Sequence, residues 1–222
     1  MKLIQRILGT LFPPKCVLCG KVLHEQETDF CGGCRVEAPV CPVDHRKKLP
    51  FLDSWLGVWY YEDSVRRSLL RYKFHGVRSY ANPYGRVLAM KLQQEHPEGF
   101  DVLTWVPISA LRRFTRGYDQ VELLAEVVAA ELEIEAVPLL KKVRHNRPQS
   151  GITGDAQRRA NVLGAYRVTD PELLKDKKIL LLDDIITTGA TVSECARMLL
   201  TAGAKEVHCG AVAIARRKKR SR

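Results

Sequence analysis

The sequence predicts an α/β domain built on a parallel sheet, preceded by a small metal-binding module. Segments with the apolar pattern of strands take turns with segments of helical periodicity from residue 54 to residue 215. The wholly apolar run at residues 179–182 indicates a strand buried on both faces, as in parallel sheets covered by helices. Five of the seven cysteines fall within the first 41 residues, which favours metal ligation over thiol packing.

Length and composition agree with this fold class. The 222 residues suit one domain of ordinary size with a small annex. A hydrophobic share of 45% and a charged share of 27% exclude wholesale disorder, collagen and a coiled coil. The formal net charge is +11, so the protein is basic.

Residues 1–12 are expected to form an amphipathic helix that docks on the rest of the protein. The apolar residues recur at helical spacing, namely Leu3, Ile4, Ile7, Leu8 and Leu11. Gln5 and Arg6 interrupt the apolar stretch and no small-residue cleavage site follows, which argues against a signal peptide. We expect no membrane span, a cytoplasmic location and reduced cysteines.

Residues 13–50 are expected to form a zinc-binding domain. Two C-x-x-C pairs separated by eleven residues supply four thiolates, Cys16, Cys19, Cys31 and Cys34, which can close a tetrahedral site. Four protein ligands leave no open position, so the zinc is expected to be structural. Cys41, Asp44 and His45 lack a fourth ligand nearby and are expected to be spare.

Residues 51–215 are expected to form the α/β domain. A strand at 54–61 leads into a helix that begins at Asp63 or Ser64 and ends at Gly76, where glycine stops helices. The later elements are expected in this order: a helix at 83–96, a strand at 101–107, a basic loop at 108–117, a helix at 119–132, a polar stretch at 141–161, a short strand at 165–168, a strand at 177–184, a helix at 187–204 and a strand at 205–215.

The most informative stretch joins the buried strand at 177–184 to the helix that follows it. Asp183 and Asp184 end the strand, at the edge where α/β sheets place their ligands. A helix amino terminus with threonine hydroxyls forms an anion site, so acids beside it suit a phosphorylated sugar. The residues expected to hold the phosphate are Thr187, Thr188, Gly189, Ala190 and Thr191.

Each part of this stretch also has a simpler interpretation. A threonine at a helix start is often only an N-cap, and an acidic pair after a strand is often a solvated turn. A Walker-type loop is excluded because no lysine follows the glycine.

The acid pair followed by TTGAT resembles the PRPP-binding signature of type I phosphoribosyltransferases, and with the cysteine pairs the chain resembles the ComF family. Residues 72–76, 106–125 and 147–166 extend the resemblance. It implies a type I phosphoribosyltransferase fold, with Asp183 and Asp184 on the ribose hydroxyls, residues 187–191 on the 5′-phosphate, and Mg²⁺ accompanying 5-phosphoribosyl 1-diphosphate (PRPP). Tyr118 and Asp119 depart from the expected Phe-Asn.

Two basic segments have candidate roles beside the acids. Arg112, Arg113 and Arg116 follow the strand at 101–107 and are expected at the same sheet edge, where they can clamp a diphosphate; the alternative is a basic surface loop. By resemblance, residues 144–161 form a flexible loop that closes over PRPP, and the alternative is disorder. The residues of this loop that could touch the ligand are Arg147, Gln149, Arg158 and Asn161.

Residues 216–222 form a tail with six basic side chains, which can neutralise phosphates of DNA or simply aid solubility. The resemblance implies a role in natural competence. Two hypotheses follow: a phosphoribosyltransferase that acts on an unidentified acceptor, or a non-catalytic competence factor that binds single-stranded DNA and a competence helicase. No residue is identified as the acceptor-activating base; His75, Tyr118 and His145 are candidates by type alone.

Overall fold

A computed structural model describes residues 13–42, 48–144 and 155–216 of the chain. Several predicted features lie outside these residues: the amphipathic helix at 1–12, the spare residues Asp44 and His45, most of the basic tail, and His145, Arg147 and Gln149 of the predicted flexible loop.

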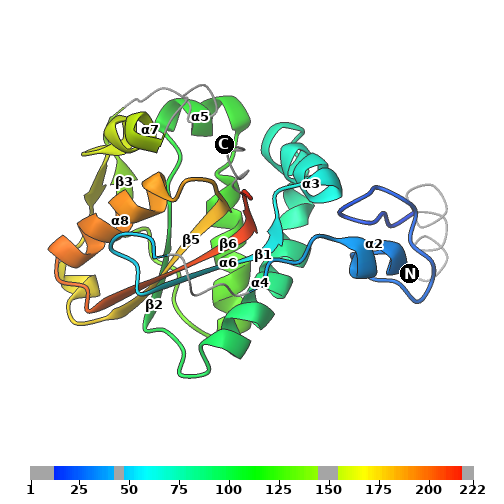
Figure 1. The fold of residues 1–222 in the computed structure, drawn as a ribbon, viewed down its shortest axis with the longest axis horizontal. Coiled ribbons are helices and arrows are strands. Elements are labelled where there is room, and N and C mark those ends of the chain that lie inside the picture. The colour runs from blue at the N-terminus through cyan, green and yellow to red at the C-terminus, as the bar shows by residue number, and fades with distance from the viewer. Residues whose placement is uncertain (1–12, 43–47, 145–154, 217–222) are drawn as a thin grey trace, which may run out of the picture.

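A parallel sheet lies at the centre of the molecule (Figure 1), in the order β1 (Ser54–Tyr60), β6 (Glu206–Ile214), β5 (Lys178–Ile186) and β2 (Val102–Trp105). Every pair of neighbouring strands is parallel. Side chains along β5 alternate between two cores, since Leu180 and Leu182 belong to one and Ile179 and Leu181 to the other. The predicted α/β fold with a parallel sheet is confirmed.

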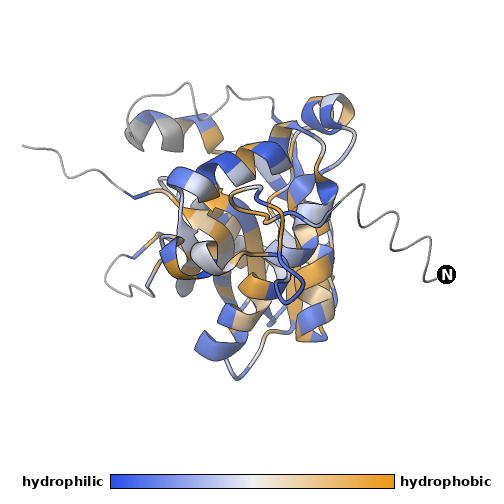
Figure 2. Ribbon diagram, turned by 90° about the vertical axis from the view of Figure 1, so that its right-hand side faces the viewer, coloured by the Kyte–Doolittle hydropathy of each residue, from blue (hydrophilic) through white to orange (hydrophobic). Residues whose placement is uncertain are grey.

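Helices cover both faces of this sheet. One core includes residues of α3 (Asp63–Phe74), α4 (Ala81–Glu95) and α6 (Gln120–Leu132). The other includes α8 (Ala190–Thr201) and a two-stranded antiparallel sheet of β3 (Leu140–Lys142) and β4 (Tyr166–Val168). The helices in Figure 2 carry hydrophilic and hydrophobic residues side by side, as elements with one buried face do. Short 3₁₀ helices, η1 (Arg78–Tyr80) and η3 (Glu172–Leu174), complete these connections.

Two segments that the sequence indicated as loops contain regular structure. The predicted basic loop at 108–117 holds α5 (Ala110–Arg116), where Ser109 caps the first turn by accepting a hydrogen bond from the Arg112 amide and Gly117 ends the helix at φ 74°. The predicted polar stretch at 141–161 holds the end of β3 and α7 (Asp155–Val162). Both helices are short and rich in charged residues, so they lack the apolar periodicity on which the sequence prediction depends.

The cysteine-rich segment packs on the α/β domain through a shared core. Its one short helix in the described part is α2 (Gly32–Glu37), at the right of Figure 1. Buried residues of the segment, including Val17, Leu18 and Leu23, belong to the same core as α3 and α4. Residues 39–41 then follow the outer edge of β1, where the Cys41 amide donates to the Val58 carbonyl at 2.9 Å.

Candidate functional site

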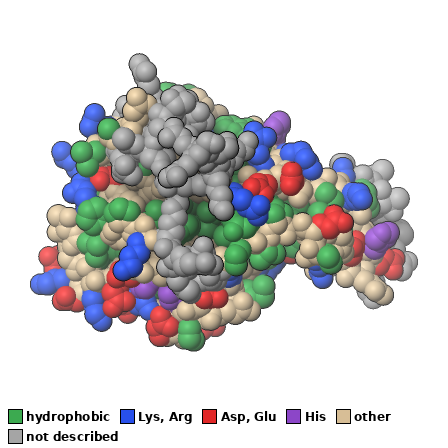
Figure 3. Space-filling model, in the orientation of Figure 1, with side chains coloured by type: hydrophobic (Ala, Val, Ile, Leu, Met, Phe, Trp, Pro, Cys, Tyr) green, Lys and Arg blue, Asp and Glu red, His purple; other side chains and the backbone are tan. Residues whose placement is uncertain are grey.

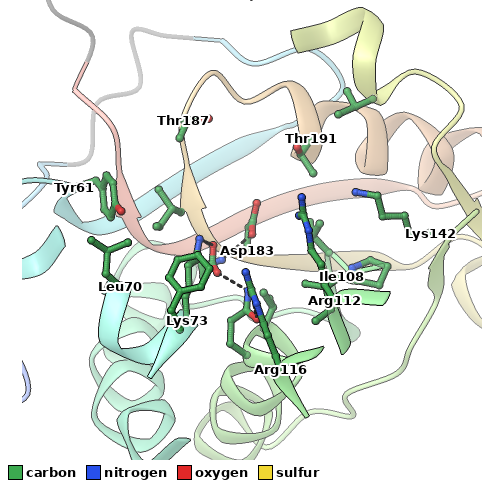
Figure 4. Close-up of a pocket in the computed structure, with 18 of the residues that line it drawn as sticks. Tyr61, Leu70, Lys73, Ile108, Arg112, Arg116, Lys142, Asp183, Thr187 and Thr191 are labelled. Carbon is green, nitrogen blue, oxygen red and sulfur yellow. Dashed lines mark hydrogen bonds and ion pairs between the residues drawn. The ribbon is translucent and has the colours of Figure 1, made fainter. Parts of the chain in front are cut away.

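A pocket of about 730 Å³ opens at the carboxyl edge of the sheet (Figure 4). It lies between α3, α5 and α6 on one side and β3, β4 and the start of α8 on the other. Its polar and charged lining consists of Tyr61, Arg66, Lys73, Arg112, Arg116, Gln120, Lys142, Asn161, Tyr166, Asp183, Asp184, Thr187 and Thr191. The pocket brings together segments from residue 61 to residue 191.

The strand ladder explains why the acid pair is available to a ligand. β2 ends at Trp105, which is paired with Leu182, whereas β5 continues beside β6 as far as Ile186. The predicted end of this strand at residue 184 is therefore two residues short. Asp183 and Asp184 lie inside β5 but beyond the end of β2, so one side of the strand at the acids faces the pocket instead of a neighbouring strand.

Asp184 is held by side chains from two helices. Lys73 Nζ of α3 lies 2.9 Å from Asp184 Oδ1, and Gln120 Nε2 of α6 donates to Asp184 Oδ2 at 2.8 Å. Arg116 Nη1 in turn donates to Gln120 Oε1 at 2.8 Å. Asp184 is only 4% exposed, so its carboxylate has lost most of its hydration. The contacts with Lys73 and Gln120 offset the free-energy cost of this desolvation.

Asp183 is in a different environment from its neighbour. Successive residues of a strand point to opposite faces, so Asp183 lies on the side of α8 and β4. Its Oδ1 accepts a hydrogen bond from the Asp184 amide at 2.8 Å. Burial, and after it the charge of Asp184, raise the pKa of Asp183 well above its ordinary value, and Lys73 opposes this rise. The environment of Asp183 thus favours its protonated form, and a cation or a hydroxyl donor bound beside it would favour the carboxylate instead.

The three arginines of the predicted diphosphate loop do not all face the pocket. Arg112 and Arg116 line the pocket. Arg113 is outside the lining and pairs with Glu122 of α6 at 2.6 Å. The Arg116 guanidinium lies 4.9 Å from the centre of the Phe74 ring, and burial lowers its pKa while Asp184 raises it. Two of the three arginines are therefore placed to meet a ligand in the pocket.

The predicted phosphate loop lies at the start of α8. Thr187 and Thr191 line the pocket (Figure 4). Gly189 is the N-cap residue of α8, and Thr188 Oγ1, just before it, accepts a hydrogen bond from the Ala190 amide at 3.3 Å. Gly189 has φ 82°, and a Cβ there would meet a Leu49 side-chain carbon at 2.5 Å. The glycine is thus required by the turn and by the packing of Leu49.

Lys73, Gln120, Lys142 and Tyr166 line the pocket but were not identified as site residues from the sequence. Lys73 and Gln120 fall within segments that carried the family resemblance, yet no pattern assigned them a role. Both are single polar residues on amphipathic helices, and such residues ordinarily face water. Only the packing of α3 and α6 against β5 shows that they reach Asp184.

The four predicted zinc ligands come together. The sulfur atoms of Cys16, Cys19, Cys31 and Cys34 lie within 4.8 Å of one another, and Cys19 Sγ is 3.6 Å from Cys31 Sγ. Ligands about 2.3 Å from a tetrahedral zinc ion have nearly this spacing, about 3.8 Å.

The electrostatics of this cluster also fit a bound cation. Burial and the neighbouring sulfurs raise the pKa of Cys34, while backbone hydrogen bonds outweigh burial at Cys16 and lower its pKa to about 7. The donor set is therefore consistent with structural zinc, which would neutralise the crowded thiolates. Among the residues described, no helix is long and apolar enough to cross a membrane.

Comparison with known proteins shows which proteins this chain resembles. Residues 122–222 match the model of the phosphoribosyl transferase domain. Competence protein F of Haemophilus influenzae is 25% identical, over 87% of this chain and 93% of that protein. Competence protein ComFC of Streptococcus pneumoniae is 28% identical, over 87% and 96%. The DNA utilization protein YhgH of Escherichia coli K12 is 25% identical, over 86% of each chain.

Among solved structures, glutamine PRPP amidotransferase from B. subtilis is 25% identical over 64% of this chain, with a TM-score of 0.43. The match spans only 30% of that enzyme. The parallel sheet is consistent with the phosphoribosyl transferase match, and the four-cysteine cluster lies in a part of the chain that precedes this match. The chain thus combines an amino-terminal cysteine module with a phosphoribosyl transferase-like domain, and along most of its length it is similar to the ComF competence proteins.

Proposed function

We propose that this protein binds PRPP in the pocket at the carboxyl edge of the sheet and transfers its phosphoribosyl group to an acceptor, with release of pyrophosphate. The observation that carries the proposal is the convergence, in one pocket, of two adjacent carboxylates, the start of a helix with threonine hydroxyls, and two arginines. Sugar hydroxyls, a phosphate monoester and a diphosphate are the groups that these three features suit.

Each feature has a role in this proposal. Asp183 and Asp184 accept hydrogen bonds from the ribose hydroxyls, and the contacts of Lys73 and Gln120 with Asp184 fix its orientation. Residues 187–191, the turn before α8 and its first two residues, donate to the 5′-phosphate. Arg112 and Arg116 stabilise the diphosphate.

The reaction breaks one bond and forms one. The bond between C1 of the ribose and the diphosphate oxygen breaks, and its electron pair leaves with pyrophosphate. The lone pair of an acceptor nitrogen forms the new bond to C1, and the acceptor then loses a proton. When bound with PRPP, Mg²⁺ supplies charge neutralisation of the leaving group, and the oxygens of Asp183 and Asp184 are of the ligand type that it prefers. The arginines stabilise the charge that develops on the leaving oxygen.

Calorimetric titration of the zinc-loaded protein with PRPP and Mg²⁺ tests the binding step. We expect Asp183→Asn to weaken PRPP binding by about tenfold or more, because the neutral amide is a poorer acceptor for hydroxyl groups. Asp176→Asn is the matched control, since Asp176 is exposed and precedes the same strand, and its left-handed backbone tolerates asparagine. Absence of PRPP binding to the wild-type protein would overturn the proposal. Pyrophosphate release in the presence of candidate acceptor amines tests catalysis separately.

A second candidate function is contact with single-stranded DNA in natural competence. Its support is the strongly basic carboxyl end, together with the names of the relatives, which are competence and DNA utilization proteins. The two functions are compatible, since the PRPP pocket and the tail are different parts of the chain. A competence helicase as partner stays a prediction of the family resemblance.

A further inference from the structure

A cluster of polar side chains lies at the amino edge of the sheet, opposite the edge that holds the pocket. Ser54 begins β1 and is opposite His208 of β6 in the strand ladder. Its hydroxyl oxygen lies 2.9 Å from His96 Nε2 and 2.8 Å from His208 Nδ1. His96 is the C-cap residue of α4, and the centres of the two imidazole rings are 4.8 Å apart. The cluster therefore joins the end of a helix to the beginnings of two strands.

The outer nitrogens of both rings face carboxylates. His96 Nδ1 is 3.2 Å from Glu98 Oε1, and His208 Nε2 is 3.3 Å from Glu206 Oε2. A hydrogen bond from Lys178 lowers the pKa of Glu98, and the contact with His208 lowers the pKa of Glu206. Both groups are thus carboxylates near neutral pH and can only accept hydrogen bonds. Each outer nitrogen must therefore carry a proton.

The four contacts of this cluster need more protons than two neutral imidazoles supply. The hydroxyl of Ser54 has one proton, so it donates to one inner ring nitrogen and must accept from the other. That second inner nitrogen carries a proton in addition to the two on the outer nitrogens. Three N–H groups on two rings correspond to one neutral imidazole and one imidazolium. The hydrogen-bond geometry is therefore complete only when the pair holds one positive charge.

The surroundings indicate that His96 is the charged ring. Its side chain is 14% exposed and that of His208 is 8% exposed. Burial is the main effect on His208 and lowers its pKa, against the opposing effect of Glu206. His96 ends a 15-residue helix, where the negative end of the helix dipole favours a cation. The charged groups that the surrounding segments place near the pair are Asp53, Glu98, Asp101, Lys178, Lys205 and Glu206.

We propose that His96 and His208 together bind one proton more than two neutral imidazoles do, and that this proton, held on His96, closes a clasp between the end of α4 and the beginnings of β1 and β6. In the closed clasp His96 donates to Glu98 and to Ser54, and the Ser54 hydroxyl donates to His208. When the proton leaves, two lone pairs face one hydroxyl proton, so one of the four contacts loses its donor. None of these residues lines the pocket, so the inference does not depend on the proposed function.

The extra proton makes the strength of the clasp depend on pH. Above about pH 6.5, the ordinary pKa of histidine, the folded protein holds this proton and the unfolded chain does not. The stabilisation by His96 is therefore fully present below about pH 6.5 and is lost as the pH rises, by up to about tenfold in the folding equilibrium per pH unit. His208, neutral in the folded protein, has the opposite relation: its contribution is present above about pH 6.5 and is lost as the pH falls.

Thermal denaturation of His96→Gln and His208→Gln between about pH 5.5 and about pH 8.5 tests these opposite dependences. Glutamine keeps a donor and an acceptor but does not titrate. We expect the advantage of the wild-type protein over His96→Gln to shrink as the pH rises, and its advantage over His208→Gln to shrink as the pH falls. His24→Gln is the matched control, because His24 is an exposed histidine of the cysteine module; its difference from the wild-type protein should not vary with pH.

Nitrogen NMR of the histidine-labelled wild-type protein reads the charge of each ring directly, even where a variant fails to fold. We expect both nitrogens of His96 and only Nε2 of His208 to be protonated at pH 7. Two neutral rings at that pH would overturn the inference, as would an advantage over a folded His96→Gln variant that is independent of pH. A second zinc ion per chain that disappears in His96→Gln would also overturn it, because the inner nitrogens would then hold a metal instead of a proton.

Discussion

The two adjacent aspartates of β5 affect the stability of the folded protein in opposite directions. Asp184 forms an ion pair with Lys73 and accepts a hydrogen bond from Gln120. Asp183 is buried beside the charge of Asp184, and its pKa is raised well above the ordinary value of 3.8. A carboxyl group with a raised folded-state pKa contributes stability fully at pH values below its unfolded pKa, and this contribution is lost as the pH rises through the folded pKa. Asp183 is therefore expected to destabilise the unliganded protein near neutral pH.

We predict that Asp183→Asn stabilises the unliganded protein by about 1–2 kcal/mol near neutral pH, although it weakens PRPP binding. Asp184→Asn should instead destabilise it by about 3 kcal/mol, because Lys73 would lose its partner in a largely buried ion pair. Thermal denaturation between about pH 5 and about pH 8 measures both effects. The advantage of Asp183→Asn should grow with pH; an advantage that shrinks with pH, or a destabilised variant, would contradict this account.

At the scale of single residues, the sequence indicated those parts of the site that are local in the chain. Asp183, Thr187 and Thr191 follow one another through the end of one strand, one turn and the start of one helix, so their spacing alone predicts a shared edge. Lys73, Gln120 and Lys142 reach the same pocket from distant segments. Their contacts depend on how helices and strands pack, which one sequence without an alignment does not specify. The divergence of Arg113 from Arg112 and Arg116 is likewise a consequence of helical geometry in α5, where the sequence predicted a loop.

At the scale of the element, α3 joins the cysteine module to the pocket. At 100° per residue, Arg66, Leu70, Lys73 and Phe74 fall within an arc of about 100°, and all four line the pocket. Ser68 and Arg71 lie on the opposite side of the helix. Ser68 donates to the Val17 carbonyl, and Arg71 Nη2 donates to the carbonyls of residues 17 and 18 at 3.0 and 2.8 Å. The backbone that carries the first cysteine pair thus contacts the helix that carries Lys73.

We predict that zinc removal loosens α3 as well as the cysteine module. Without the metal, four crowded sulfurs have nothing to hold residues 16–34 in place, and α3 then loses the carbonyl partners of Ser68 and Arg71. A chelator should lower the melting temperature by about 4–8 °C, equivalent to about 2 kcal/mol for a chain of this size. Hydrogen exchange should accelerate in residues 63–74 and stay slow in β5.

Cysteine variants serve as controls for the zinc prediction. Cys19→Ser should abolish zinc binding and reproduce the effect of the chelator, which should then add nothing. Cys41→Ser removes a buried cysteine that is not one of the four clustered sulfurs, so it should keep one zinc per chain. Unchanged exchange in α3 after zinc removal would show that the module and the helix are independent.

Helices and strands with a clear apolar pattern could be predicted from the sequence, and those without one could not. The apolar runs of β5 and β6 and the amphipathic stretches of α3, α6 and α8 identify the sheet and its main helices, because burial imposes a period of two or of 3.6 residues. α5 and α7 carry mostly polar and charged residues. β3 is three residues long, too short to show a period. Its pairing with β4 is a long-range contact that leaves no local signal.

At the scale of the whole molecule, the positive charge is concentrated in a few segments. Residues 217–222 carry five basic side chains and no acid, and residues 1–12, 43–47 and 145–154 add a net four. Subtracting these nine from the formal +11 leaves +2 for the residues that the structure describes. In Figure 3, Lys and Arg side chains are accordingly interspersed with Asp and Glu over the coloured surface. A polyanion would therefore meet its main attraction at the carboxyl end of the chain.

We predict that deletion of residues 217–222 weakens single-stranded DNA binding and lowers its dependence on salt. Each phosphate contact on a single strand contributes about 0.7 to the slope of log affinity against log salt concentration, so loss of five basic groups should lower the slope by up to about 3.5. Fluorescence anisotropy with a labelled oligonucleotide over a range of salt concentrations measures this slope.

A double variant, Lys175→Gln with Lys177→Gln, is the control for overall charge. It neutralises two exposed lysines elsewhere and should leave the slope nearly unchanged. An unchanged slope after the deletion would show that the tail does not contact DNA, whereas an equal loss in the lysine variant would indicate that overall charge, not the tail, attracts the strand. PRPP binding should be the same with and without the tail, because the pocket is built from residues 61 to 191.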